Sequence, residues 1–206
     1  MRGRFVTLEG GEGAGKSTQA LLLAEALRAE GREVALTREP GGSQGAEAIR
    51  DLLLGGATPF MPEAEVLLHF AARFDHVARL IRPALERGAW VIADRFADST
   101  LAYQGWGLGA DRDLIADLTR RLGFAPDLTL ILEVPEDVAA ARLRARDRRD
   151  DRYERLDAAF HRRVAAGFRA IAAAEPGRCV LVDGNGEVSV VHGRVMEALR
   201  RAAARF

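Results

Sequence analysis

A glycine-rich segment near the start of the chain has the residue types and spacing that hold nucleotide phosphates. Residues 10–17 read Gly-Gly-Glu-Gly-Ala-Gly-Lys-Ser and match the pattern G-x-x-x-x-G-K-[ST] in full. Glycines let backbone N–H groups approach phosphate oxygens, the Lys16 ammonium suits the β- and γ-phosphates, and the Ser17 hydroxyl can ligate Mg²⁺. The predicted ATP site comprises Gly10, Gly11, Glu12, Gly13, Ala14, Gly15, Lys16 and Ser17.

Lys16 is also the only lysine of the chain. Lysine and arginine total 30 residues, so the other 29 are arginines. A compact ammonium acts as a point charge that a planar guanidinium does not reproduce. The single lysine therefore stands at the one position where the predicted chemistry requires it.

Charged residues also follow the next predicted strands. Asp94 and Arg95 come directly after the apolar residues 90–93, and Arg38 follows the strand predicted at 33–37. Because ligands bind beyond the carboxyl ends of parallel strands, we expect four strand ends to converge on one cleft: these two, the glycine-rich segment after the first strand, and Glu133 after the fourth. Asp94 could hold Mg²⁺, directly or through water, fix a partner side chain, or cap the next helix. Two arginines beyond those that ATP requires indicate a second anionic ligand, although either alone could form a surface ion pair.

The segment between residues 142 and 155 is rich in arginine, with seven arginines against four acids. As a lid, it would bring guanidinium groups to a transferring phosphoryl group and stabilise its transition state. A solvated helix face with ion pairs is one alternative. A nucleic-acid patch is another, but no aromatic residues are interleaved as a stacking platform. The arginines are Arg142, Arg144, Arg146, Arg148, Arg149, Arg152 and Arg155.

His69 and Arg73 lie four residues apart in a predicted helix and therefore share one of its faces. An aromatic ring and a guanidinium on one face could stack on a nucleotide base and hydrogen-bond its edge. The alternative is a packed histidine beside a surface charge.

These residues need a scaffold, and the apolar periodicity predicts alternating strands and helices. A parallel sheet of five strands covered by helices on both faces is the α/β architecture that this alternation favours. Pro83 is expected to kink or divide the longest helix. The predicted strands are 5–8, 33–37, 90–93, 128–134 and 179–182. The first predicted helix follows the glycine-rich segment and ends near residue 31. The other predicted helices span 46–54, 63–87, 111–122, 136–146, 153–174 and 188–204, and residues 97–109 are expected to form a helix and then a loop.

The composition limits the classes of function. The 206 residues suit one domain, and 30 acids balance 30 bases, so the whole chain is not an electrostatic nucleic-acid binder. The single Cys179 excludes an internal disulfide and a cysteine-based metal cluster. No apolar stretch is long enough to span a membrane, and residues 1–4 leave no room for a signal peptide before the first strand. We expect a soluble cytoplasmic protein.

The chain resembles bacterial thymidylate kinases, of the P-loop nucleoside monophosphate kinase family. The matching segments cover the chain nearly end to end. Two of them, residues 37–42 and 94–105, are specific to the family. The resemblance implies a P-loop NTPase three-layer sandwich of one domain, residues 1–206, with the lid at about 142–155. It implies transfer of the γ-phosphoryl group of ATP to dTMP with Mg²⁺, giving dTDP and ADP in dTTP synthesis, by a homodimer. The segments are 9–19, 37–42, 71–73, 94–105, 126–130 and 151–154, with the lid arginines.

The resemblance also implies residue roles. Arg38 and Arg95 would hold the dTMP phosphate, Arg73 would reach thymine O4, and Tyr103 would lie against the deoxyribose. The implied catalytic residues are Lys16, Glu12, Arg95, Arg142, Arg146 and Arg152. Thr18 joins the ATP site, and Ser17 and Asp94 form the metal site. The implied substrate-binding residues are Glu12, Arg38, Pro40, His69, Phe70, Arg73, Arg95, Ser99, Thr100, Tyr103 and Gln104.

Three departures from the family pattern stand out. His69 replaces a usual phenylalanine, so stacking on thymine could be weaker, pH-dependent or taken over by Phe70. Phe96 replaces a tyrosine or histidine, and Glu133 replaces an aspartate. Two other functions stay open: a kinase of another nucleotide or a deoxynucleoside, and a nucleotide-dependent switch that transfers nothing.

Overall fold

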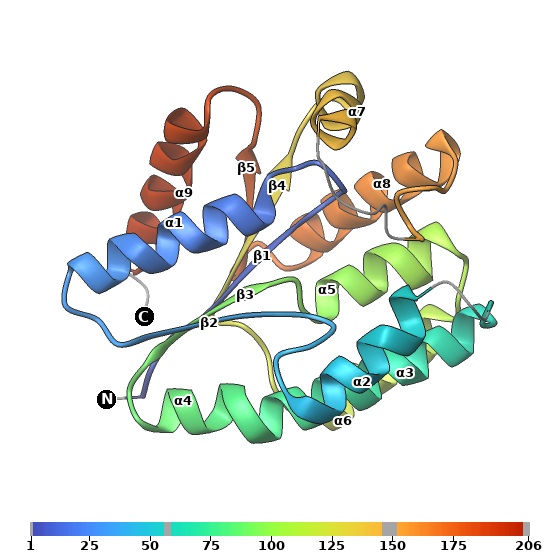
Figure 1. The fold of residues 1–206 in the computed structure, drawn as a ribbon, viewed down its shortest axis with the longest axis horizontal. Helices are drawn as coiled ribbons and strands as arrows, with labels where there is room; N and C mark the ends of the chain where they lie inside the picture. Colours follow the sequence, from blue (N-terminus) through green and yellow to red (C-terminus); the bar gives the residue numbers. More distant parts are fainter. Residues whose placement is uncertain (1, 56–58, 146–151, 204–206) are drawn as a thin grey trace.

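Five parallel strands form the centre of the molecule, in the order β2-β3-β1-β4-β5 (Figure 1). The computed structural model describes residues 2–55, 59–145 and 152–203. All neighbouring strands pair in parallel, which is the α/β sheet that the alternating pattern predicts. The strands are β1 (Phe5–Gly10), β2 (Val34–Arg38), β3 (Trp90–Asp94), β4 (Leu128–Glu133) and β5 (Cys179–Asp183).

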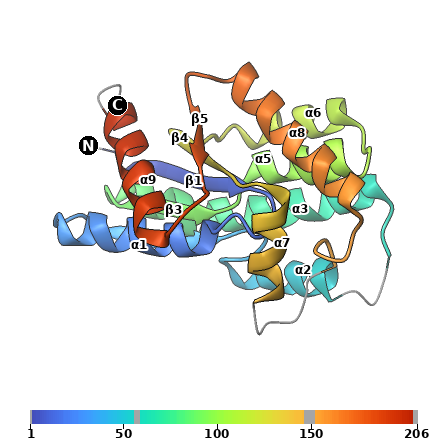
Figure 2. The same cartoon turned by 90° about the horizontal axis from the view of Figure 1, so that it is seen from above.

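Helices cover both faces of this sheet and make it the middle of three layers (Figure 1, Figure 2). Helices α1 and α9 pack on one face, and α4, α5 and α8 pack on the other. The α-helices are α1 (Lys16–Ala29), α2 (Gln44–Leu54), α3 (Pro62–His76), α4 (Arg82–Glu86), α5 (Ala97–Thr100), α6 (Arg112–Leu122), α7 (Glu136–Arg144), α8 (Ala158–Ala174) and α9 (Val188–Ala203). Two π-helices, η1 (Val77–Ile81) and η2 (Leu101–Gly107), join them.

Strand β1 lies between two neighbours and between both helical layers, and it is buried along its whole length. Val6 and Leu8 face the layer of α1 and α9, while Phe5 packs edge-on against Phe96 in the opposite layer. This burial explains why β1 reads as a short apolar run. The loop that follows β1 therefore starts from the most completely buried strand of the sheet.

Pro83 changes the type of helix around it and does not end the helical stretch. The π-helix η1 precedes α4, and the Arg82 N–H bonds to the Val77 carbonyl five residues back. Proline cannot donate a backbone hydrogen bond, and its ring crowds the carbonyl four residues earlier. The wider π turn accommodates both constraints, so the chain stays helical from Pro62 to Glu86.

Several boundaries differ from the sequence expectation. Helix α8 starts at Ala158 and not near Tyr153, because the Asp157 carboxylate caps it by accepting the Phe160 N–H at 2.7 Å. Residues 101–107, expected partly as loop, stay helical as η2. Residues 146–151 lie outside the described residues, so Arg146, Arg148 and Arg149 of the predicted lid do too. Within the described ranges, no helix is long and apolar enough to cross a bilayer.

Candidate active site

The glycine-rich loop connects β1 to α1 and passes very close to α7. Gly13 has a φ of +73°, and a Cβ there would lie 2.6 Å from the Ala139 carbonyl oxygen, so only glycine fits. The loop leads into the N terminus of α1, where free N–H groups and the helix dipole favour an anion. The Lys16 ammonium donates to the Gly11 carbonyl at 2.7 Å. The Lys16 ammonium thus lies against the loop, beside the N terminus of α1.

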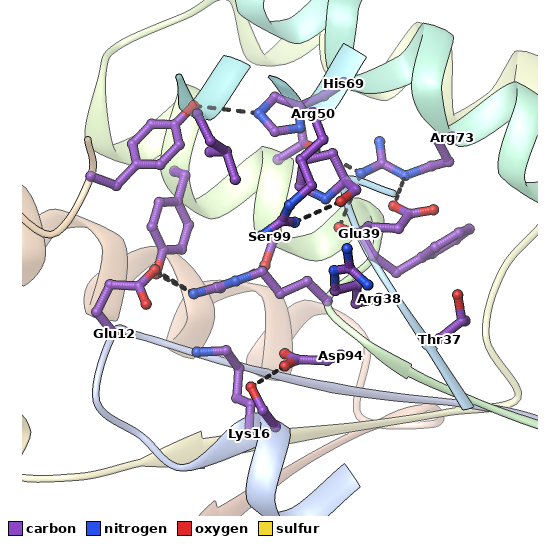
Figure 3. Close-up of a pocket in the computed structure, with 18 of the residues that line it drawn as sticks. Glu12, Lys16, Thr37, Arg38, Glu39, Arg50, His69, Arg73, Asp94 and Ser99 are labelled. Carbon is purple, nitrogen blue, oxygen red and sulfur yellow. Dashed lines mark hydrogen bonds and ion pairs between the residues drawn. The ribbon is translucent and has the colours of Figure 1, made fainter. Parts of the chain in front are cut away.

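A cavity of about 810 Å³ opens beyond the carboxyl ends of β1, β2 and β3 (Figure 3). Lys16 and Glu12 line it from the loop, Arg38 from the end of β2, and Asp94 and Arg95 from the end of β3. Three of the four strand ends that were expected to converge therefore do so.

The fourth strand end does not line this cavity. Glu133, at the end of β4, accepts a hydrogen bond from Arg169 at 2.7 Å and faces α8. Arg142, in α7, donates to the carbonyls of Gly13 and Gly184 at 3.4 and 3.1 Å. Arg142 therefore lies beside the phosphate loop and outside the cavity lining.

One end of the cavity brings a guanidinium group and several carboxylates together. The Arg95 guanidinium donates to Glu12 at 2.5 Å and to the Tyr103 hydroxyl at 2.9 Å. The Ser17 hydroxyl donates to Asp94 Oδ2. The other Asp94 oxygen, Oδ1, is buried, and no described residue bonds to it. A buried carboxylate oxygen without a partner fits a cation ligand.

Glu9 holds the turn that places Arg95. Arg95 has a φ of +72°, a left-handed backbone that is unusual for a residue with a side chain. Directly after it in the chain, the Phe96 N–H and the Ser99 hydroxyl donate to the two Glu9 oxygens at 2.7 and 2.5 Å. Burial, and then the nearby Asp98, raise the pKa of Glu9 to about 8. The buried carboxyl group thus fixes a strained turn, and the Arg95 side chain faces the cavity.

Arg73 marks the other end of the cavity. Its side chain is 2% exposed, and its Nε donates to Glu39 at 2.7 Å in a fully buried ion pair. Nη2 donates to the Phe96 carbonyl and to the Thr100 hydroxyl. Nη1 is buried, and none of the described residues accepts its hydrogens. An unpaired buried donor is costly, so a carbonyl-bearing ligand at this end would gain affinity.

His69 lies on the same wall as Arg73 and stays neutral. Burial, and then the positive charge of Arg73, lower the pKa of His69 to about 3. Its Nε2 lies 3.4 Å from the Tyr153 hydroxyl. The expectation of pH-dependent stacking by His69 is therefore not favoured near neutral pH, where this ring carries no charge.

Comparisons with known proteins identify the family of this chain. The family model described as thymidylate kinase matches residues 8–195. A thymidylate kinase of Gluconobacter oxydans is 55% identical over 98% of this chain and 96% of its own. That of Rhizorhabdus wittichii is 54% identical over 97% of this chain and 98% of its own.

The chain belongs to the thymidylate kinase family.

A solved structure agrees with this assignment. The thymidylate kinase of Ehrlichia chaffeensis matches with a TM-score of 0.79 and 37% identity, over 97% of this chain and 99% of that one. The P-loop NTPase fold predicted from the sequence is therefore confirmed, as is the resemblance to this family.

The structure gathers most of the predicted thymidylate kinase residues around this cavity. The phosphate loop forms one rim of it, with Thr18 exposed in the first turn of α1. The predicted residues that line the cavity are Glu12, Lys16, Ser17, Arg38, Pro40, His69, Arg73, Asp94, Arg95, Ser99, Thr100, Tyr103 and Gln104.

Three predicted residues lie elsewhere. Phe70 packs in the core with Val66 and Ile115, so it does not face the cavity. Arg152 pairs with the buried carboxylate of Glu65 and, like Arg142, is absent from the cavity lining. Arg146, the remaining lid arginine of the implied catalytic set, falls outside the described residues.

Other cavity residues were missed in the sequence. Glu39, Arg50, Tyr153 and Glu154 line the cavity, and Glu39 anchors Arg73. Glu39 follows Arg38 directly in a predicted turn, so its position at a strand end could have identified it. Tyr153 was assigned to a helix, and only its true position in a turn brings it to the cavity.

Proposed function

We propose that the cavity binds dTMP with its phosphate at Arg95 and Arg38 and its thymine against Arg73. As a member of its family, the chain phosphorylates dTMP to dTDP with ATP, in dTTP synthesis. The observation that carries the placement is the unpaired Arg73 Nη1. It supplies a buried donor for thymine O4 at the end of the cavity that lies away from the phosphate loop.

The remaining substrate roles follow from this orientation. Tyr103 would lie along the deoxyribose, and Glu12 would approach its 3′-hydroxyl group. Glu12 also pairs with Arg95, so the incoming phosphate competes with this carboxylate for the same guanidinium. Thr100 orients Arg73 by accepting from Nη2 at 3.0 Å. Pro40, Ser99, Gln104 and His69 complete the walls.

Phosphoryl transfer needs alignment and charge neutralisation more than proton transfer. The dTMP phosphate is itself the nucleophile, so no general base is required. We assign neutralisation of the transferring group to Lys16 and Arg95. Among the described lid arginines we favour Arg142, because it already contacts the phosphate loop. We assign Arg152 to charge compensation of Glu65.

The residues present fit a magnesium ion that is held largely by phosphates. Across the described ranges, no three His, Cys, Asp or Glu side chains gather into a metal site. Mg²⁺ usually keeps its waters and takes one or two protein ligands together with substrate phosphates. We assign the Ser17 hydroxyl and Asp94 Oδ1 to it, where the ion would neutralise charge on the ATP phosphates.

We further propose that the protein works in the cytoplasm as a homodimer that joins through α3. Exposed apolar side chains recur there at helical spacing, and Leu67 and Phe74 are 52% and 42% exposed. Ala71 and Ala78 continue the same stripe. A regular apolar stripe on a surface helix is typical of a protein interface. The cytoplasm is where ATP and dTMP, both charged metabolites, are available.

ADP release tests the proposed function. The enzyme receives ATP and Mg²⁺ with dTMP, dUMP, dCMP, dGMP, UMP or thymidine in separate reactions. We expect release that strongly favours dTMP. Release with another acceptor would overturn the thymine assignment of Arg73. Slow hydrolysis that no acceptor stimulates would support a nucleotide switch instead.

A further inference from the structure

Helix α3 presents polar residues where a packed helix normally presents apolar ones. Glu65, His69, Arg73 and His76 are buried at spacings of four, four and three residues, and so share the inward face. Arg73 contacts the proposed base, and His76 supports it through Glu39 at 2.9 Å. Glu65 has no place in this scheme, although it is 0% exposed. A carboxylate is costly to bury, so its contacts identify its role.

The groups around Glu65 all donate to it. The Arg152 guanidinium pairs with Oε1. The Tyr153 hydroxyl donates to Oε2 at 2.9 Å, and Gln104 Nε2 lies 3.4 Å from the same oxygen. Gln104 Nε2 also donates to the Tyr153 oxygen at 2.9 Å. A carboxylate paired with a guanidinium only accepts hydrogen bonds, so it sets the direction of every bond in this group.

The direction of these hydrogen bonds also determines which atoms of Gln104 and His69 can accept hydrogen bonds in the cavity. The Tyr153 hydroxyl has one hydrogen, which goes to Glu65, so its oxygen accepts from Gln104 and from His69 Nε2. The amide hydrogens of Gln104 point to oxygens; the reverse orientation would put Oε1 against the carboxylate. Gln104 Oε1 and, in the resulting neutral tautomer, His69 Nδ1 are then acceptors. Gln104 and His69 both belong to the cavity wall.

We propose that Glu65 is a positioning residue that fixes these acceptors and thereby selects a pyrimidine with an N–H beside a carbonyl. This inference rests on the proposed function. With the Arg73 donor, the base end offers one donor and neighbouring acceptors. Thymine presents the complementary O4 and N3–H, whereas cytosine presents an amine and an unprotonated N3. Glu65 contacts no substrate and acts through Tyr153 and Gln104.

Binding of two nucleotides tests this role. Dissociation constants of dTMP and dCMP are measured by titration calorimetry for the wild type and for Glu65→Gln, which can donate as well as accept. We expect dTMP binding to weaken about tenfold, the typical effect of one hydrogen bond to a charged group, with dCMP binding not weakened. Glu63→Gln is the matched control, because Glu63 lies in the same first turn of α3 but is exposed. It should change neither constant.

A second variant keeps the test decisive if Glu65→Gln fails to fold. Tyr153→Phe removes the hydroxyl through which Glu65 acts, and it should also weaken dTMP without weakening dCMP. In the double variant, the Glu65→Gln effect on dTMP should largely disappear. Equal weakening of both nucleotides, no weakening, or additive effects would each overturn the positioning role. If the wild type still releases ADP in a dTMP-dependent manner, these results would overturn only the role of Glu65 and would not contradict the proposed function.

Discussion

The surroundings of Lys16 lower the pKa of its ammonium group overall, although the nearby carboxylates of Glu12, Asp94 and Glu9 act in the opposite direction. Burial, and then the positive charge of Arg95, lower the pKa of Lys16 to about 8. The side chain is 6% exposed, so little water is available to stabilise the ammonium. In the free enzyme this lysine therefore loses its proton far earlier than an exposed one.

The lowered pKa of Lys16 predicts that activity decreases as pH rises. Because only the ammonium neutralises phosphate charge, kcat/KM for ATP should fall as pH rises above about 8, approaching tenfold per pH unit. Steady-state kinetics between pH 7 and 10 measures it. Lys16→Arg, less active but charged throughout this range, should lack the decline. A flat wild-type profile would show that Lys16 stays protonated in the free enzyme.

Two substitutions of Arg73 can distinguish the effect of its ion pair with Glu39 from the effect of its unpaired Nη1 donor. Arg73→Lys keeps a cation near Glu39 but removes the planar fork that carries Nη1. We expect the KM for dTMP to rise at least about tenfold, with the KM for ATP within about twofold. Arg73→Ala would also leave the buried Glu39 without its guanidinium partner, at a cost of about 3–5 kcal/mol in stability. Equal rises in both KM values for Arg73→Lys would place the base elsewhere.

Residue types alone predicted the groups that face phosphate better than the groups that support them. Lys16, Arg38, Asp94 and Arg95 stand at strand ends, where position along the chain already implies convergence. Glu65 stands inside a helical pattern and reads like any surface acid. Its role depends on Tyr153, 88 positions away, and no local pattern in a single sequence carries that contact.

At the scale of elements, η2 and α8 lock together through two glycines. A Cβ on Gly107 would lie 2.4 Å from the Phe160 ring, and one on Gly167 would lie 2.7 Å from Trp106. Each helix thus leaves room for an aromatic ring of the other. The contact matters for the site because η2 carries Tyr103 and Gln104.

Adding a methyl group at this contact should cost stability. We expect Gly107→Ala to lower the free energy of unfolding by about 1–3 kcal/mol, since the ring must move in a dense interior. Gly193→Ala, in α9, is the control: a Cβ there meets nothing within 4 Å, and alanine favours a helix by about 1 kcal/mol. Denaturant unfolding measures both. A neutral Gly107→Ala would mean that η2 and α8 separate easily.

Elements were predicted to within a few residues where apolar periodicity was strong, as in the five strands. The errors arose where local chemistry competes with periodicity. Asp157 starts α8 late because its side chain caps the helix, a signal that the sequence contains. Pro83 was expected to kink or divide the longest helix, but the chain stays helical there through a π turn. That choice depends on how η1 packs against the sheet, which periodicity does not describe.

For the whole molecule, the stripe on α3 predicts the state of assembly. We expect light scattering to give a mass about twice the 22.4 kDa of one chain. Phe74→Glu should give monomers, because a carboxylate would be buried without a partner in the interface. Leu181→Glu, equally exposed on the edge strand β5, should leave the mass unchanged. A dimer that survives Phe74→Glu would place the interface on another face.

The lone lysine also makes the molecule unusual as a chemical target. Reagents that acylate amines react with the unprotonated form, and arginine side chains do not compete for them at neutral pH. Lys16 is the single lysine, and its pKa of about 8 leaves a substantial share of the amine reactive under mild conditions. An acylating label therefore has one side-chain destination, on the floor of the nucleotide site. The extent of labelling at Lys16, measured apart from that of the α-amino group of the chain, then reads out occupancy of that site without any engineered tag.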